Sequence, residues 1–309
     1  MDLQAPVEGP GVAVARGDAP WPPAEGPDGP SPFDTLRPSG PGGVLDDAFV
    51  LLRTRFGRIV GLAACLYVPI RLLDLVTMIA TGTAVERVQV GPSVMAFGVG
   101  TGWSWVLGLQ SLALSVLGMC VGHLALRNAT GGDASFRELA RLALRRGWVA
   151  VLVVPLGLLV KAPLSCVPLG FLFGDALVFL SSVVAGAEGL GPVRAWRRGM
   201  QLTRRSYGPM LVVAFGGFVV SQVLRVSFYT GPVLLAGALL GDDALLGVIF
   251  QAGALVVLIA EPLTACIAAR AYLEVRSRTE GLDLQRRVRE RYGTAPVTEV
   301  AAPPATVAA

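Results

Sequence analysis

The chain has 309 residues, of which 53% are hydrophobic and only 16% are charged. Soluble domains carry about 25% charged residues, so this composition excludes an ordinary soluble domain. Several apolar runs reach the ~20 residues that span a bilayer, and the basic residues behind the formal net charge of +4 lie mostly between these runs. This placement favours a membrane-orientation signal over a nucleic-acid-binding surface, so we predict a polytopic membrane protein with no nucleic-acid partner.

The two ends of the chain differ in composition from its middle. Residues 1–41 are rich in Pro and Gly and poor in large apolar side chains, so we expect a disordered cytoplasmic tail. The pattern of a basic start followed by an apolar segment, which marks a signal peptide, is not found there, and the first crossing is expected to serve as the targeting signal. Residues 42–292 form the predicted membrane domain, and residues 293–309 form a second disordered tail.

The membrane domain is predicted to be an all-α helix bundle of about six transmembrane helices, arranged as three hairpins. The predicted crossings are residues 59–80, 103–126, two within 148–187, 210–229 and 245–272, with a further apolar segment at 233–240. Lys161, Pro163, Pro168 and Asp175 interrupt the third apolar run. We therefore expect that run to turn near residues 161–170.

An amphipathic basic helix is predicted before each hairpin. The three predicted helices end in similar sequences, which are LLRTRFG at 51–57, LALRRG at 142–147 and QLTRRSYG at 201–208. Before the second of these, in the predicted helix at residues 131–147, Ser135 and Glu138 have the spacing of a capping box. The order of basic helix, glycine and crossing thus recurs three times and indicates a weak internal repeat.

The clearest of these basic helices lies within residues 188–208. At about 100° per residue, Val193, Trp196 and Met200 fall on one side and most arginines on the other. This pattern is typical of a helix lying on an anionic membrane surface; the alternative is a cytosolic loop whose charges only set the topology. Under the first interpretation, the residues that contact anionic lipids are Arg194, Trp196, Arg197, Arg198, Arg204 and Arg205.

Basic residues are concentrated on one side of the six-crossing arrangement. That side receives the arginines of the three basic helices and of the segment after residue 275. The other side receives Arg87 and Lys161, together with Asp242 and Asp243. Because basic residues are enriched in cytoplasmic loops, both termini are predicted to lie in the cytoplasm.

Three segments carry a resemblance to a known family. They are GGVLDDAFVLLRTRFG at 42–57, EGLGPVRAWRRGMQLTRRSYG at 188–208 and RAYLEVRSRTEGLDLQ at 270–285. Together they resemble the bacterial, especially actinobacterial, membrane-domain family of glycerophosphoryl diester phosphodiesterase. The resemblance implies a six-helix domain of the bacterial plasma membrane. The catalytic phosphodiesterase domain is missing, and the single histidine, His123, supplies no reason to assign that chemistry.

Ionisable residues inside predicted crossings are costly and are therefore candidates for function. Five of them are expected at a similar level in the outer half of the membrane: Arg71, Asp74, Lys161, Asp175 and Arg225. They either form an outward polar pocket for an anionic head group or solute, or they pair and reach the interface; Arg71 and Asp74 have the spacing to pair on one helix. Glu261, followed by Pro262, is a candidate carboxylate at a helix kink, or a structural hydrogen-bonding group.

No catalytic cluster and no metal-ligand spacing are found, and the four cysteines are scattered, so we predict neither an enzyme nor a cofactor. We expect a scaffold or accessory subunit of an envelope or lipid-related system, with anionic lipids at its cytoplasmic face and a membrane-protein partner or a second copy. The alternative is a transporter or lipid-handling permease built around the outward polar residues.

Overall fold

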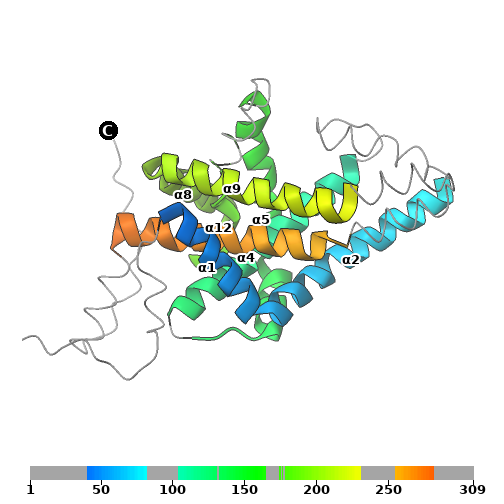
Figure 1. Ribbon diagram of the computed structural model, residues 1–309, viewed down its shortest axis with the longest axis horizontal. Coiled ribbons are helices and arrows are strands. Elements are labelled where there is room, and N and C mark those ends of the chain that lie inside the picture. The colour runs from blue at the N-terminus through cyan, green and yellow to red at the C-terminus, as the bar shows by residue number, and fades with distance from the viewer. Residues whose placement is uncertain are drawn as a thin grey trace, which may run out of the picture. The chain divides into compact units, whose positions relative to one another are not determined.

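The computed structural model describes residues 40–81, 104–130, 132–164, 174, 176, 178–230 and 255–281, and all regular secondary structure in these residues is helical (Figure 1). The chain divides into two compact units, residues 1–31 and 32–309, and every described helix belongs to the second. The predicted tails, except residues 40 and 41, and the apolar segment at 233–240 lie outside the described residues.

Four described segments are long and apolar enough to cross a membrane. They are Phe56–Thr77, Gly108–Ala129, Phe136–Leu164 and Tyr207–Phe228. They belong to the helices α2 (Phe56–Thr81), α4 (Ser104–Ala129), α5 (Phe136–Leu164) and α9 (Tyr207–Arg225), the last continued by a π-helical turn, Val226–Thr230. The prediction of an all-helical membrane protein is therefore confirmed at this level.

Two of the three predicted basic helices are separate elements. One residue, Arg55, separates the helix α1 (Gly40–Thr54) from α2, and one residue, Ser206, separates α8 (Pro192–Arg205) from α9. At the first junction Arg55 forms a turn, and its carbonyl accepts hydrogen bonds from the backbone N–H groups of Arg58 and Ile59, each at 3.1 Å. The first and third basic helices therefore meet the following helix at a defined elbow, as the junction sequences predict.

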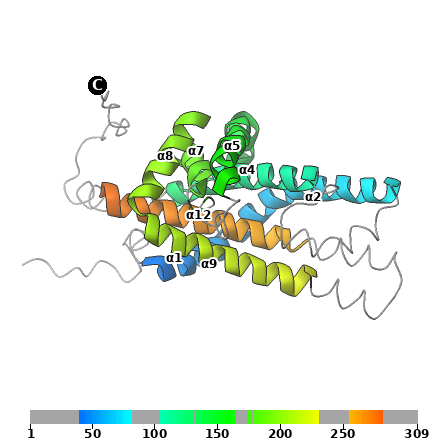
Figure 2. The ribbon, with the colours of Figure 1, turned by 90° about the horizontal axis from the view of Figure 1, so that it is seen from above.

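The second basic helix is not separate, which corrects the prediction of an independent helix over 131–147. Instead, α5 begins at Phe136 and continues through Gly147 to Leu164. The Ser135 hydroxyl accepts a hydrogen bond from the Glu138 N–H at 3.3 Å, in agreement with the capping-box spacing. Gly147 is buried opposite Val116 of α4, so packing keeps the helix intact where its sequence permits a break. In Figures 1 and 2, α5 runs across the direction that α9 and α12 share.

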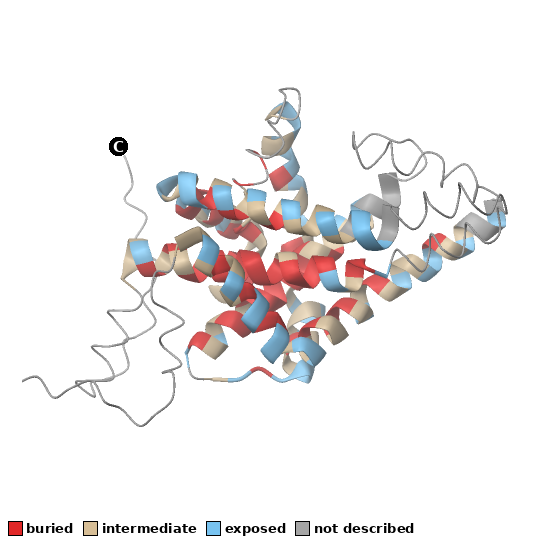
Figure 3. Cartoon of the chain, viewed as in Figure 1, coloured by how far each residue is buried: buried red, intermediate tan, exposed pale blue. Residues whose placement is uncertain are grey.

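The core lies around α4 and α12 (Val257–Glu280), which are buried over most of their length (Figure 3). Next to them, α7 (Ser181–Ala187) approaches α4 very closely through small residues. A methyl group added at Gly186 would overlap the backbone carbonyl of Met119, and one added at Gly122 would lie 2.7 Å from the carbonyl oxygen of Val183. Glycine at these positions is what allows the two helices to pack at this distance.

Each basic segment packs on helices that lie outside its own predicted repeat. The helix α1 packs against α9 and α12, and α8 packs against α5 and α7. The start of α5 packs against α2 and α4: Phe136 covers Gly61, and the Cys120 thiol lies 3.7 Å from the Leu139 carbonyl oxygen. The basic segments therefore connect helices that lie far apart in the sequence.

Candidate functional site

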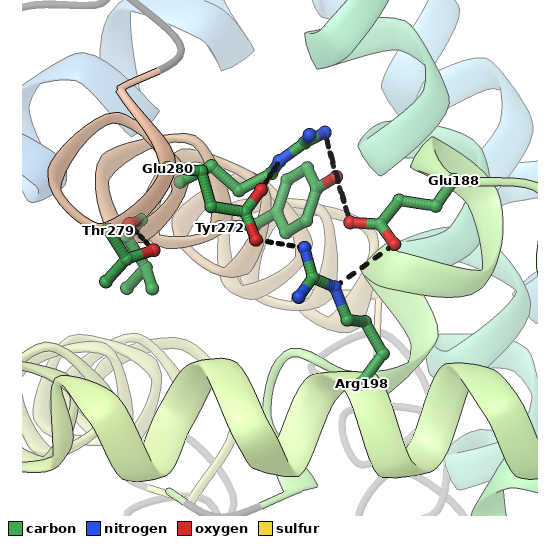
Figure 4. A network of polar contacts seen from close by, with 7 residues as sticks. Glu188, Arg198, Tyr272, Thr279 and Glu280 are labelled. Carbon is green, nitrogen blue, oxygen red and sulfur yellow. Dashed lines mark hydrogen bonds and ion pairs between the residues drawn. The ribbon is translucent and has the colours of Figure 1, made fainter. Parts of the chain in front are cut away.

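A network of polar side chains joins the ends of α7 and α12 to α8 (Figure 4). Glu188, directly after α7, accepts a hydrogen bond from the Tyr272 hydroxyl at 3.0 Å and lies 3.4 Å from the Arg198 Nε of α8. On α12, Arg276 donates hydrogen bonds to the Tyr272 oxygen at 2.9 Å and to Glu280 at 2.8 Å. Arg198 also pairs with Glu280. We call these five residues the α7–α8–α12 network.

Local sequence places each member of this network. Tyr272, Arg276 and Glu280 are four residues apart on α12, so they lie on one face of that helix. The turn after α7 passes through Gly189, whose φ of +64° favours glycine, and Arg146 donates a hydrogen bond to the Gly189 carbonyl. On α8, Gly199 allows close approach to α7, since an added methyl group would lie 2.8 Å from the Ser181 Cα.

Electrostatics favours the ionised form of Glu280 in this network. Burial alone raises the pKa of Glu280, but the hydrogen bonds and charges of Arg276 and Arg198 outweigh burial and leave its pKa below the ordinary value. The network holds two arginines and two glutamates, so its own charges balance. Each of its four charged side chains is between 15% and 22% exposed. The arrangement is suited to holding three helices together.

Further ion pairs link other helices in the same way. Arg270 of α12 pairs with Asp47 of α1, and the Gly40 N–H at the start of α1 donates a hydrogen bond to Glu274 at 3.2 Å. Asp133, in the loop before α5, pairs with Arg55 at 3.0 Å and with Arg58. The Arg58 hydrogen bond holds the pKa of Asp133 below its ordinary value. Residues 53–58 also line a shallow surface depression at the α1–α2 elbow.

Of the five residues predicted in the outer half of the membrane, the structure pairs two. Arg71 Nη1 lies 3.7 Å from Asp74 Oδ2 on α2, and the Asp74 side chain is fully buried. Lys161 lies near the end of α5, next to the backbone of Gly174. Asp175 and the side chain of Arg225 lie outside the described residues. A common pocket for the five therefore stays a prediction.

Glu261 is buried in α12, with 5% of its surface exposed. The helix continues through the following Pro262, which is only the sixth residue of the element. Near a helix start, proline removes no intrahelical hydrogen bond or only one. Its presence therefore does not interrupt α12, and the functional interpretation of Glu261 stays a prediction.

The five arginines among the predicted lipid-contacting residues of α8 separate into two groups. Arg194, Arg197, Arg204 and Arg205 are exposed and form no ion pair among the described residues. Arg198 differs, because it belongs to the α7–α8–α12 network. Trp196 is half-buried, and its indole N–H has no hydrogen-bond partner within the described part of the chain.

The buried stripe of α8 also differs from the predicted one. The helix buries Ala195, Gly199 and Leu202 against protein, whereas Val193 is 48% exposed. The physical reason is the close approach to α7, because Gly199 lies against Ser181 without space for an added methyl group and so centres the buried stripe on itself. Of the predicted stripe, Met200 is buried and Trp196 is half-buried. The apolar face of α8 is therefore largely covered by protein.

The network was not predicted as a site, although all of its members lie in the segments that carry the family resemblance. Within the described residues, no group of three or more His, Cys, Asp or Glu side chains is placed to hold a metal ion. Comparison with protein-family models, with curated proteins and with solved structures found no match. The geometry of the chain itself is thus the basis for any functional assignment.

Proposed function

We propose that this protein is an integral scaffold or accessory subunit of the bacterial plasma membrane, without enzymatic activity, in an envelope or lipid-related system. The observation that carries the proposal is that its inward-facing arginines form ion pairs within the protein. Arg198, Arg276 and Arg270 all form ion pairs with carboxylates outside their own helix. Charges engaged in this way fix helices relative to one another, which is what a platform for partner proteins requires.

The proposed topology has six crossings with both termini in the cytoplasm and an anionic leaflet beneath the basic helices. Eight exposed arginines of the described chain form no ion pair there: Arg53, Arg137, Arg141, Arg145, Arg194, Arg197, Arg204 and Arg205. All eight belong to the three basic segments. Each cation near an anionic leaflet contributes about 1 kcal/mol of attraction, so this distribution supports a cytoplasmic position for the segments. Membership of the resembled membrane-domain family is part of the same proposal.

Affinity purification from native membranes, followed by lipid and protein identification, tests the proposal. We expect a membrane-protein partner at a constant ratio to the chain, together with anionic phospholipids. The Glu188→Gln variant is expected to lose the partner, while the exposed-surface variant Gln201→Ala retains it.

The permease alternative is tested in the same preparation. Purified protein in sealed vesicles is expected to leave the permeability to anionic solutes and lipids unchanged. Solute or lipid movement that requires both Arg71 and Asp74 would overturn the scaffold assignment and establish the transporter.

A further inference from the structure

The outward face of α5 carries exposed arginines beside exposed apolar side chains. Arg137, Arg141, Arg145, Trp148 and Leu152 follow one another at steps of three or four residues along a single unbroken helix. At about 100° per residue they share one sector, together with Leu144. All six side chains are exposed. We call them the α5 strip.

The strip combines exposed cations with exposed apolar groups. Leu144 is 87% exposed, Trp148 is 59% exposed and Leu152 is 46% exposed. The opposite face of the same helix is buried in the protein through Leu139, Val149 and Val153. The exposure of the strip is thus a property of one face of a well-packed helix.

Nothing in the described chain neutralises the arginines of this strip. Arg137, Arg141 and Arg145 form no ion pair or hydrogen bond among the described residues. By contrast, the neighbouring Glu138 is already engaged by Arg127 at 2.7 Å. The three cations are therefore free for an external anion.

We propose that the α5 strip is a binding site for anionic phospholipids, an inference that rests on the proposed membrane location. The arginines bind head-group phosphates, and Leu144, Trp148 and Leu152 contact the glycerol and acyl region. The order of side chains along the helix supports this assignment, because all three arginines precede Trp148 and Leu152 follows it, while Leu144 lies between Arg141 and Arg145. Arginine suits head groups, tryptophan suits the interface and leucine suits hydrocarbon.

The exposed face of α8 is a matched contrast. It presents Arg194, Arg197, Arg204 and Arg205 with Gln201, and Val193 is its one large apolar side chain above one-third exposure. Such a face attracts an anionic leaflet through charge alone, an attraction that salt screens. The α5 strip adds apolar contact and therefore retains lipid when salt has weakened the electrostatic attraction.

Native mass spectrometry of the purified chain at moderate salt tests this proposal by counting retained phosphatidylglycerol molecules. The double variant Arg141→Gln, Arg145→Gln is expected to reduce lipid affinity roughly 25-fold, since each cation contributes about a fivefold factor. Leu144→Ser with Trp148→Ser, which leaves the charge unchanged, is also expected to remove retained lipid. The α8 control, Arg194→Gln with Arg197→Gln, removes the same charge and is expected to change retention by less than about threefold.

Equal loss in the α5 and α8 double variants would overturn the proposal, because charge alone would then explain retention. Unchanged retention in both α5 variants would overturn it as well. Circular dichroism and gel filtration show whether each variant remains folded. Alkaline carbonate extraction separates this test from the membrane assignment: a chain that stays in the membrane without retaining lipid refutes the strip alone, whereas a chain released by carbonate refutes the proposed membrane location.

Discussion

The basic helix α8 and the first half of α5 follow the same sequence pattern, yet the structure uses them differently. On α8 the apolar stripe is buried against α7, and Arg198 is held by Glu188 and Glu280. On α5 the arginines have no acidic partner among the described residues, and Leu144 and Trp148 stand exposed beside them. An arginine's role in these helices therefore depends on whether a carboxylate from another part of the chain lies within reach.

The largest expected effect comes from breaking the close packing that positions Glu188. Gly186→Ala would place a methyl group on the Met119 carbonyl, a backbone atom that cannot move without shifting α4. We expect a loss of at least about 3 kcal/mol and failure to accumulate in membranes. Gly57→Ala is the control, because nothing lies within 4 Å of its added methyl group. Equal accumulation of the two variants would contradict the packing of α7 on α4.

A second large effect is expected inside α2, where Asp74 is fully buried beside Arg71. Asp74→Asn removes one member of the pair, and breaking a buried pair costs about 3–5 kcal/mol. The double variant Arg71→Gln, Asp74→Asn is expected to be milder than either single variant. Thermal unfolding in detergent measures all three. If their midpoints coincide, the pair has no structural role, unlike the network at Glu188.

A smaller effect is expected in the α7–α8–α12 network itself. Glu188→Gln removes a carboxylate that lies near both Arg198 and Arg276, and hydrogen bonds to charged groups contribute about 1.5–3 kcal/mol. Arg141→Gln, on the exposed face of α5, is expected to change stability by less than about 0.5 kcal/mol. Chemical unfolding in one detergent compares the two. A similar loss in both would mean that the two basic helices do not differ in the way described.

The smallest effect concerns pH. The pKa of Glu280 lies below its ordinary value of 4.5 in the folded chain, so its ionised form stabilises the fold. This contribution is fully present above pH 4.5 and is lost as the pH falls through the lowered pKa. We expect a midpoint of thermal unfolding that is flat between about pH 8 and pH 5 and decreases below it. Glu280→Gln is expected to be less stable at neutral pH and to show a shallower decrease.

The sequence predicts much of the fold through apolar run length and junction pattern. The runs at 59–80, 103–126 and 210–229 overlap α2, α4 and α9, and the glycine junctions locate the ends of α1 and α8. The break predicted at Gly147 is wrong because α4 packs against that position. The helix continues through Gly147 because of a tertiary contact, and helix propensity takes no account of tertiary contacts.

The candidate site was less accessible to prediction. The four-residue spacing of Tyr272, Arg276 and Glu280 indicates one face of a helix, but their partner Glu188 lies 84 residues before Tyr272. Helical periodicity on α8 is compatible with a buried stripe through Trp196 or one through Gly199. Only the close contact of Gly199 with Ser181 of α7 shows that the second is buried. Long-range packing of this kind cannot be inferred from a single sequence, whereas the Arg71–Asp74 pair could be predicted because it is local.

The contrast between α5 and α8 is tested most directly by where each helix meets lipid. An environment-sensitive fluorophore is attached in a cysteine-free background at Leu144→Cys on α5 or at Gln201→Cys on α8, both of which are exposed positions. In anionic vesicles, the probe at position 144 is predicted to be quenched by lipid-attached nitroxides and protected from aqueous iodide. The probe at position 201 is predicted to show the reverse. Lipid quenching at position 201 with iodide quenching at position 144 would contradict the account.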